Sequence, residues 1–329
     1  MKVSILIPFY NASLFIERAL LSALNQTYPY IECIMVDDGS KDESIFRIQS
    51  IIKNHKRKES TRVIKHDSNK GVASARNTCI NNATGNYVFF LDSDDELPLN
   101  AIENLVKSNI NSKADLVLGE FNVTGGVREK FVEIKIKTKV EGNNEIFNSF
   151  ISHKWYDGTC NKLVKRKFLL DNNISFYANI VHEDILWSFE IAMKATLIIY
   201  CSEITYIYHL RSNSITQNMS ERNFKSLIFI MKKMVEYDQE FKLHKAHIQL
   251  FNYYANLRIY FLKKLILWTN EKSIVKKMID QINLIFSHKE YNKISNYSME
   301  SMLKLIPYKT SVSLSVLYIR LLLSLKKQQ

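Results

Sequence analysis

Residues 87–96, YVFFLDSDDE, join five apolar residues to a cluster of acidic ones. A short continuous apolar run is typical of a strand that is buried on both faces of a sheet. Asp92 and Asp94 follow two positions apart, where this strand ends. Positions i and i+2 of an extended chain face the same side, so the two carboxylates should point the same way. The stretch therefore predicts a buried strand with paired carboxylates at its carboxyl end.

Paired carboxylates in this D-x-D arrangement repel each other unless a cation lies near them. Oxygen ligands suit Mg²⁺ or Mn²⁺, particularly when a diphosphate completes the coordination. A solvent-facing acidic turn, or an N-cap for a helix that starts near Pro98, would explain the same residues without a metal. Both interpretations remain open at this point.

Strand and helix patterns alternate before this stretch. Apolar runs predict strands at 3–7, 31–36 and 62–65, and apolar residues at helical spacing predict helices at 14–24, 45–52 and 72–82. Such alternation predicts an α/β fold with a mostly parallel sheet flanked by helices. Ligands of these sheets bind outside the carboxyl ends of the strands.

Unusual residues also follow the first two predicted strands. The first is expected to stop at Pro8, before Phe9-Tyr10-Asn11, and the second at Asp37-Asp38-Gly39-Ser40. A carboxylate at this edge could bind a base N–H or a ribose hydroxyl, or simply cap the next helix. Arg76, at the start of a predicted helix, could pair with a phosphate or a base carbonyl, or form a surface ion pair.

The second half of the chain differs in pattern and charge. A strand is predicted at 116–118 and a β-like stretch at 131–139, and after about 220 the pattern is helical with almost no Gly or Pro. Residues 221–329 hold 19 Lys and Arg against 8 Asp and Glu, which is most of the net charge of +12. Such a surface attracts anionic membrane, nucleic acid or a phosphorylated acceptor, or is a set of solvated lysines.

The four cysteines and the hydropathy indicate a compartment. Cys33, Cys79, Cys160 and Cys201 are widely spaced, which argues against a zinc site or a disulfide framework and favours a reducing cytosol. No apolar stretch reaches the roughly 18 residues that a membrane span requires. We therefore expect a cytoplasmic protein.

Five motifs occur in the order that is found in family 2 glycosyltransferases, and the chain resembles that family. They are Pro8-x-Tyr10-Asn11, Val36-Asp37-Asp38-Gly39-Ser40-x-Asp42, Gly71-x4-Arg76-Asn77, Gly85-x-Tyr87 and Leu91-Asp92-Ser93-Asp94-Asp95. The resemblance is strong over about 1–110. It continues more weakly through Asn161-Lys162-Leu163, His182-Glu183-Asp184-Ile185-Leu186-Trp187 and Tyr208-His209-Leu210-Arg211-x2-Ser214.

The resemblance implies a GT-A-like fold and its division into parts. Residues 1–215 would form the glycosyltransferase domain, with a Rossmann-like nucleotide-binding half at 1–100 and an acceptor half at 101–215. Residues 216–329 would form a basic α-helical C-terminal region. The implied reaction is metal-dependent, inverting transfer of a hexosyl or N-acetylhexosaminyl group from a nucleotide-diphosphate sugar, with UDP-sugar preferred. The acceptor would be a glycan or lipid-linked saccharide of a bacterial surface-polysaccharide pathway.

The resemblance also implies roles for individual residues. Donor-binding residues would be Pro8, Tyr10, Asn11, Asp38, Arg76, Asp92, Ser93, Asp94, His209 and Arg211. Among these, Asp38 would read the base, and Asp94 with Asp92 would hold Mn²⁺ or Mg²⁺. Asp184 would be the general base, with Glu183 as the alternative base or an acceptor ligand.

Plainer explanations exist for three of these residues. Glu183 and Asp184 could simply begin a helix, and His209 could be a packed or surface residue beside the tyrosines.

The tail predicts an amphipathic helix from 311 onward. Its polar stripe holds Ser313, Arg320, Ser324 and Lys327, and its apolar face holds Leu314, Leu317, Leu321, Leu322 and Leu325. A broad apolar face beside cations suits a helix that lies in a membrane interface, here on the inner face of the cell membrane. Packing against the helical region or a second subunit explains the same pattern.

Two other functions fit parts of the sequence. A nucleotidyltransferase of similar fold also places Asp pairs near phosphate, but no Gly-rich phosphate loop follows the first strand. A non-catalytic protein that binds nucleotide or nucleic acid would use the basic C-terminal region. The acids clustered at strand ends argue against it, so we expect no nucleic-acid partner.

Overall fold

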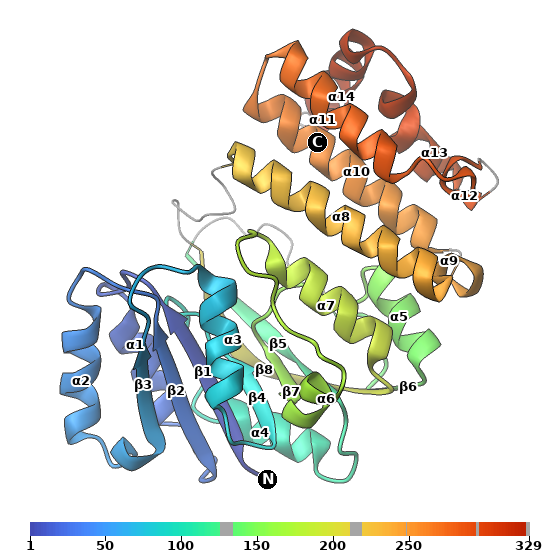
Figure 1. The fold of residues 1–329 in the computed structure, drawn as a ribbon. Coiled ribbons are helices and arrows are strands. Elements are labelled where there is room, and N and C mark those ends of the chain that lie inside the picture. The colour runs from blue at the N-terminus through green and yellow to red at the C-terminus, as the bar shows by residue number, and fades with distance from the viewer. Residues whose placement is uncertain (126–133, 211–218, 248, 294–295, 327–329) are drawn as a thin grey trace. The chain divides into compact units, whose positions relative to one another are not determined.

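The computed structural model describes residues 1–125, 134–210, 219–247, 249–293 and 296–326 (Figure 1). The chain divides into two compact units, Met1–Ser214 and Ile215–Gln329. The first unit contains the β-sheet, and the described part of the second is helical.

An eight-stranded sheet forms the centre of the first unit, in the order β3-β2-β1-β4-β7-β5-β8-β6. The strands are β1 Val3–Phe9, β2 Ile31–Asp37, β3 Thr61–Lys65, β4 Tyr87–Phe90, β5 Leu116–Thr124, β6 Lys139–Glu141, β7 Lys162–Lys165 and β8 Leu197–His209. Neighbours pair in parallel except at β7 and β6, which run antiparallel to the strands beside them. The predicted mostly parallel sheet is confirmed.

Helices cover both faces of this sheet. They are α1 Ile16–Leu24, α2 Ser44–Asn54, α3 Val72–Asn82, α4 Ala101–Asn109, α5 Asn143–Ile151, α6 Arg166–Asp171 and α7 Glu183–Lys194. Val3, Ile5 and Ile7 of β1 share a core with α1 and α4. Side chains alternate along a strand, so Leu6 faces the other side, where α3 crosses β1 and β2 (Figure 1).

The second unit is a helical bundle, which confirms the predicted helical C-terminal region. Its helices are α8 Glu221–Phe241, α9 Leu243–Ala246, α10 Gln249–Trp268, α11 Lys272–Ile285, α12 Lys289–Asn292, α13 Met299–Leu305 and α14 Val312–Lys326. The Phe224 ring packs 5.5 Å from Phe261 and 5.1 Å from Trp268, measured between ring centroids. In the part of the chain that the structure describes, no helix is both long enough and apolar enough to cross a membrane.

Two predicted boundaries are wrong. Pro8 does not end β1, which continues to Phe9 with Pro8 opposite Val36. Because β4 pairs with β1 only from Val3 to Leu6, Pro8 lies at a local edge, where a missing N–H is tolerated. In the predicted β-like stretch, residues 134–138 are not a strand, the strand being Lys139–Glu141, and residues 131–133 lie outside the described part.

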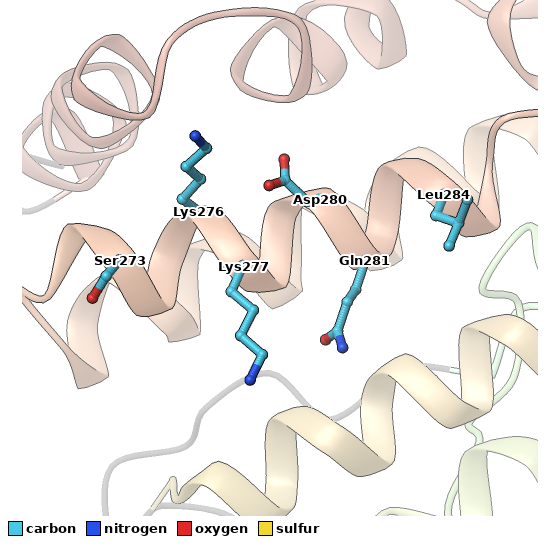
Figure 2. Close-up of a pocket in the computed structure, with 6 residues that line it drawn as sticks. All are labelled: Ser273, Lys276, Lys277, Asp280, Gln281 and Leu284. Carbon is cyan, nitrogen blue, oxygen red and sulfur yellow. The ribbon is translucent and has the colours of Figure 1, made fainter.

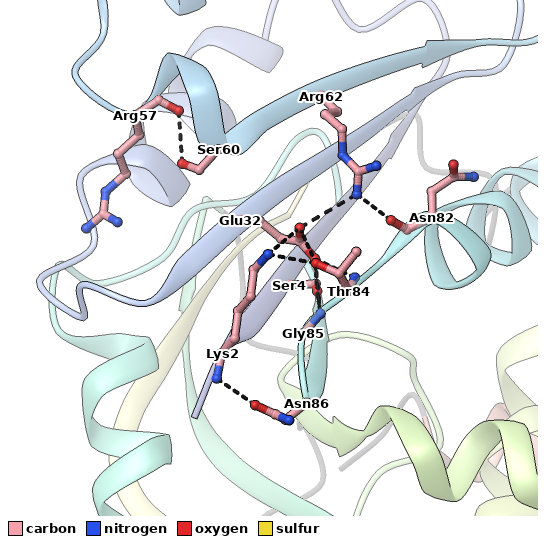
Figure 3. Close-up of polar contacts among 10 residues, drawn as sticks. All are labelled: Lys2, Ser4, Glu32, Arg57, Ser60, Arg62, Asn82, Thr84, Gly85 and Asn86. Carbon is pink, nitrogen blue, oxygen red and sulfur yellow. Dashed lines mark hydrogen bonds and ion pairs between the residues drawn. The ribbon is translucent and has the colours of Figure 1, made fainter.

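A buried carboxylate holds the amino ends of the central strands together (Figure 3). Glu32 of β2 accepts hydrogen bonds from Ser4 Oγ at 2.6 Å and from Thr84 N at 2.6 Å, and it pairs with Lys2 Nζ at 2.9 Å. Burial alone would raise the pKa of Glu32, but these hydrogen bonds lower it to about 2. The contacts join β1, β2 and the turn before β4, so they help to set the register of the strands whose opposite ends carry the acidic residues.

We expect Glu32→Gln to lower the free energy of unfolding by about 2 kcal/mol at pH 7, since a buried charged acceptor is lost. The pKa of Glu32 is depressed in the folded state, so its contribution is present above the unfolded pKa and is lost as pH falls toward 2. Urea unfolding of both proteins between pH 7 and pH 3 tests this. The difference should shrink with acid, and the exposed control Glu59→Gln should have little effect at any pH. A pH-independent difference would contradict the assignment.

Candidate active site

The predicted site residues gather at one edge of the sheet. Since β1, β2 and β4 are parallel neighbours, their carboxyl ends lie together. Tyr10 and Asn11 follow β1, Asp38 follows β2, and Asp92 opens the turn after β4. The topology therefore brings three of the predicted segments to one place.

The loops after β1 and β2 hold each other in place. The Asn11 backbone N donates to Ser40 Oγ, and its side-chain oxygen accepts from Lys41 N, both at 2.9 Å. Asn11 has a φ of 47°, in the left-handed region that Asn tolerates better than most residues. Pro8 is buried in β1, and Tyr10 is 44% exposed. The exposed Tyr10 ring is thus held on a fixed loop at the sheet edge.

Asp38 is almost fully buried, and its carboxylate organises the turn before α3. It accepts from Lys70 N at 2.9 Å and Gly71 N at 2.7 Å, and it contacts His66 Nδ1 at 2.8 Å. His66 was not singled out from the sequence. Gly71 has a φ of 87°, which favours glycine. Asp38 therefore shapes the loop that leads into α3.

Asp37 carries an unused buried oxygen beside this loop. Its Oδ1 accepts from Ser40 N at 2.8 Å, whereas Oδ2 is buried and has no hydrogen-bond partner. Buried polar atoms are normally paired, so this oxygen marks Asp37 as a site candidate that the sequence analysis quoted within a motif but gave no role.

Arg76 joins three predicted site segments. From α3, its Nη1 donates to Glu183 Oε1 at 2.5 Å and its Nη2 to Asp92 Oδ1 at 3.1 Å. The guanidinium also lies 5.4 Å from the centroid of the Phe176 ring. Burial alone would lower the pKa of Arg76, but the charges of Asp92, Glu183 and Asp184 keep it raised. The ion pairs bring α3, the acidic turn and the start of α7 into contact.

Glu183 and Asp184 stand in the first turn of α7, as the helix-start interpretation expected. The helix is anchored by Trp187, which stacks on Phe176 at 4.8 Å and packs edge-on against Phe90 of β4. Burial, followed by the negative charges of Glu183 and Asp157, raises the pKa of Asp184 to about 7. A carboxylate that titrates near neutral pH suits proton transfer.

His209 is brought to the acidic turn through Asp95. The buried Asp95 carboxylate accepts from His209 N at 2.9 Å and from Tyr206 OH at 2.8 Å, and the same hydroxyl accepts from Asp92 N at 3.1 Å. Burial and the Asp92 charge raise the pKa of Asp95 to about 7. Asp95 lies in the motif Leu91-Asp92-Ser93-Asp94-Asp95 but had no role predicted from the sequence, and Tyr206 was not singled out there. Arg211 lies outside the described residues.

The acidic turn, residues 92–95, suits a hard divalent cation only when a bound substrate supplies some of the coordinating oxygens. Among the described residues, no group of three or more His, Cys, Asp and Glu is arranged to hold a metal. Asp92, Ser93 and Asp94 are partly exposed, and the buried Nε2 of His209 has no hydrogen-bond partner, lying 3.4 Å from Glu96 Oε2. Carboxylate oxygens are the ligands that Mg²⁺ and Mn²⁺ prefer. The residues thus fit a metal whose remaining ligands come from a bound diphosphate.

A separate cavity of about 530 Å³ lies along α11 in the second unit (Figure 2). It is lined by Ser273, Lys276, Lys277, Asp280, Gln281 and Leu284. All six residues come from one helix, and none belongs to the predicted site. The cavity therefore does not mark the chemistry that the acidic residues could perform.

Comparisons with known proteins identify the family of the chain. Residues 4–170 match the model of the family "Glycosyl transferase family 2". The uncharacterized glycosyltransferase YibD of Escherichia coli (strain K12) is 28% identical over 222 residues, which cover 66% of this chain and 63% of YibD, less than two thirds of its length. Poly(ribitol-phosphate) beta-N-acetylglucosaminyltransferase TarP of Staphylococcus aureus (strain N315) is 31% identical over 232 residues, 68% of each chain.

A solved structure shows the same fold. The crystal structure of S. aureus TarS 1-349 in complex with UDP-GlcNAc matches with a TM-score of 0.61 over 89% of this chain and 93% of that one, at 18% identity. At this identity the likeness concerns the fold alone, which is the GT-A fold of glycosyltransferases. With the family model covering half of the chain, and TarP above 30% identity, the chain belongs to glycosyl transferase family 2.

Proposed function

We propose that this glycosyltransferase moves a sugar, with inversion, from a UDP-sugar to a glycan or lipid-linked saccharide in bacterial surface-polysaccharide synthesis. The observation that carries the proposal is the Arg76 bridge, which holds a donor-side carboxylate, Asp92, beside the acids of α7. The TarS complex with UDP-GlcNAc supports the donor class, and TarP, a poly(ribitol-phosphate) beta-N-acetylglucosaminyltransferase, supports the acceptor class. Membership of the family argues against a nucleotidyltransferase and against a nucleic-acid-binding protein.

The donor would lie across the carboxyl ends of β1, β2 and β4. We assign the nucleotide side to Pro8, Tyr10, Asn11, Asp38 and Arg76, and the ribose and diphosphate side to Asp92, Ser93, Asp94 and His209. Arg211 remains a prediction from the sequence. The loop that Asp38 organises through Lys70 and Gly71 supports a role near the base.

Charge balance supports a metal at Asp94 and Asp92. The Arg76 guanidinium already pairs with Asp92 and Glu183, so its charge is not available to neutralise a diphosphate. When bound there, Mn²⁺ or Mg²⁺ would act as a Lewis acid toward the departing diphosphate. Asp94 and Asp92 would hold the ion, with the Nε2 of His209 close to the same turn.

Asp184 is our choice as general base over Glu183. The Glu183 carboxylate is buried and already engaged by Arg76 at 2.5 Å, which leaves it poorly placed to meet an acceptor hydroxyl. Asp184, whose pKa is raised to about 7, can take the proton of the acceptor hydroxyl while the hydroxyl oxygen bonds to the anomeric carbon. Attack on the face opposite the leaving nucleoside diphosphate inverts the configuration.

We also propose that α14 lies in the membrane interface on the inner face of the cell membrane. Leu314, Leu317 and Leu321 are each more than half exposed, whereas Ser315 and Ile319 face the bundle and are buried. The basic charge of this unit would complement anionic lipid. This arrangement supports peripheral binding and brings the enzyme to a lipid-linked acceptor.

The donor proposal predicts a metal-dependent thermal shift. At about 100 times its dissociation constant, UDP or a UDP-sugar with Mn²⁺ or Mg²⁺ should add about 2.7 kcal/mol and raise the unfolding midpoint by about 5 °C. Asp94→Ala should abolish the metal-dependent part, and the exposed control Asp171→Ala should keep it. GDP and dTDP serve as comparison nucleotides. A shift of equal size without metal, or one retained in Asp94→Ala, would refute the metal assignment.

The assignment of the base predicts different effects at adjacent positions. Asp184→Asn should lower kcat by about 10²–10⁴-fold with little change in donor affinity. Wild-type kcat/KM should fall on the acid side of pH 7, because protonation of Asp184 removes the base. Initial rates across pH, with calorimetric donor binding, measure both effects. If Asp184→Asn retains wild-type turnover, Asp184 is not the base.

The membrane proposal predicts that Leu317→Glu combined with Leu321→Glu weakens binding to anionic phosphatidylglycerol vesicles by at least about tenfold. The reason is that two leucine side chains that would insert into the membrane are lost. Leu284→Glu, at an exposed leucine of α11, is the matched control and should bind normally. Vesicle sedimentation of the full chain measures this. Unchanged partition of the double variant would overturn the membrane assignment and favour a protein–protein role for α14.

A further inference from the structure

Lys162 belongs to the motif Asn161-Lys162-Leu163, for which the sequence predicted no role. It is a fully buried lysine without a carboxylate partner. Its Nζ lies 3.9 Å from the centroid of the Tyr156 ring and 5.7 Å from that of Trp155, and it donates to the carbonyl of Gly158. No ion pair joins Lys162 to any acid in the part of the chain that the structure describes. Burial of an ammonium group with so few partners is costly, so packing alone is a weak reason for a lysine here.

Tyr156 and Trp155 form an aromatic cage around the Lys162 ammonium, and Asn161 holds this cage in place. Its φ is 56°, and its side-chain amide donates to Gly119 O at 2.7 Å while its oxygen accepts from Thr205 Oγ1 at 2.5 Å. The Asn161 carbonyl accepts from Tyr156 OH at 2.5 Å. Lys162 therefore starts from a fixed backbone and lies against a fixed ring, so its ammonium has little freedom to move.

The cage is tied to the helix that carries Asp184. Ser188 of α7 donates to the backbone oxygen of Asp157, in the loop between Tyr156 and Lys162, at 2.6 Å. The charged groups around Asp184 are Glu183, Asp157, Arg76 and Lys162. Arg76 is already shared between Glu183 and Asp92. Lys162 is therefore the cation that remains to balance Asp184.

We propose that Lys162 is a positioning residue for the base, and that its buried ammonium keeps Asp184 ionised without touching the substrate. The inference rests on the proposed role of Asp184. The groups that act on the Lys162 amine are the thiol of Cys160 and the carboxylates of Asp157 and Asp184.

The two groups titrate in the same range. Burial lowers the pKa of Lys162 to about 7, while burial raises that of Asp184 to about 7. Each opposite charge favours ionisation of the other group, so the pair titrates as a unit. Removal of the Lys162 charge must therefore raise the pKa of Asp184 and move the acid limb of the activity profile to higher pH.

The test is the pH dependence of kcat/KM for Lys162→Met, an uncharged side chain of similar length. We expect the acid limb to move upward by about one pH unit, activity at pH 7 to fall several-fold, and part of it to return at alkaline pH. Lys165→Met, on the same strand but partly exposed and 4.0 Å from Asp115, is the matched control and should keep the wild-type profile. Thermal unfolding and donor binding establish that both variants are folded.

A second measurement covers the case in which Lys162→Met does not fold. Lysine side-chain amines of the ¹⁵N-labelled full chain, followed by NMR across pH, should include one that titrates near neutral pH. In Asp184→Asn this titration should move to lower pH, because the neighbouring negative charge is gone. A titration that stays in place in this variant would overturn the inference.

The failures of the two proposals can be told apart. If Asp184→Asn is fully active, the base assignment fails and the inference about Lys162 fails with it. If Asp184→Asn is inactive while Lys162→Met has a lower kcat and an unshifted pH profile, Lys162 is only structural. In that case the proposed function stands and this inference alone is refuted.

Discussion

The ion pairs of Arg76 are the interaction on which the candidate site depends. One buried guanidinium binds Asp92, 16 positions along the chain, and Glu183, 107 positions along. Without that cation, the buried Glu183 would lie beside further carboxylates with no neutralising partner, at a cost of several kcal/mol. The contact also fixes the start of α7 against the acidic turn. The relative placement of Asp92 and Glu183 thus follows from a single side chain of α3.

Charge compensation divides the site into two parts. Arg76 balances Asp92 and Glu183, and Lys162 is placed to balance Asp184. Asp95 faces inward and ties the acidic turn to Tyr206 and the backbone of His209, whereas Asp92 and Asp94 are more exposed. An anionic donor would enter a site whose resident cations are already engaged. Under the proposed function, a metal ion bound together with the diphosphate would resolve this imbalance.

Much of the fold could be predicted because its signals are local. Apolar runs identified β1, β2 and β4, Arg62-Val63-Ile64-Lys65 was predicted as the strand that is now β3, and α3 was predicted over the same residues, Val72–Asn82, that the structure shows. The antiparallel β7 between β4 and β5 could not be predicted in this way. Strand order depends on pairing between distant segments, and no periodicity within Lys162–Lys165 reports its neighbours.

The sequence by itself determined which residues stand at the strand ends, because alternating apolar strands and helices place the turns of a parallel sheet at one edge. It also determined that Asp92 and Asp94 come two apart and that Glu183 and Asp184 are adjacent. Only the tertiary structure decided how these carboxylates are used. It buried Lys162 in an aromatic cage, turned Asp95 inward and gave Arg76 two partners. Such choices depend on burial and on charges from segments far apart in the chain, which local residue patterns do not encode.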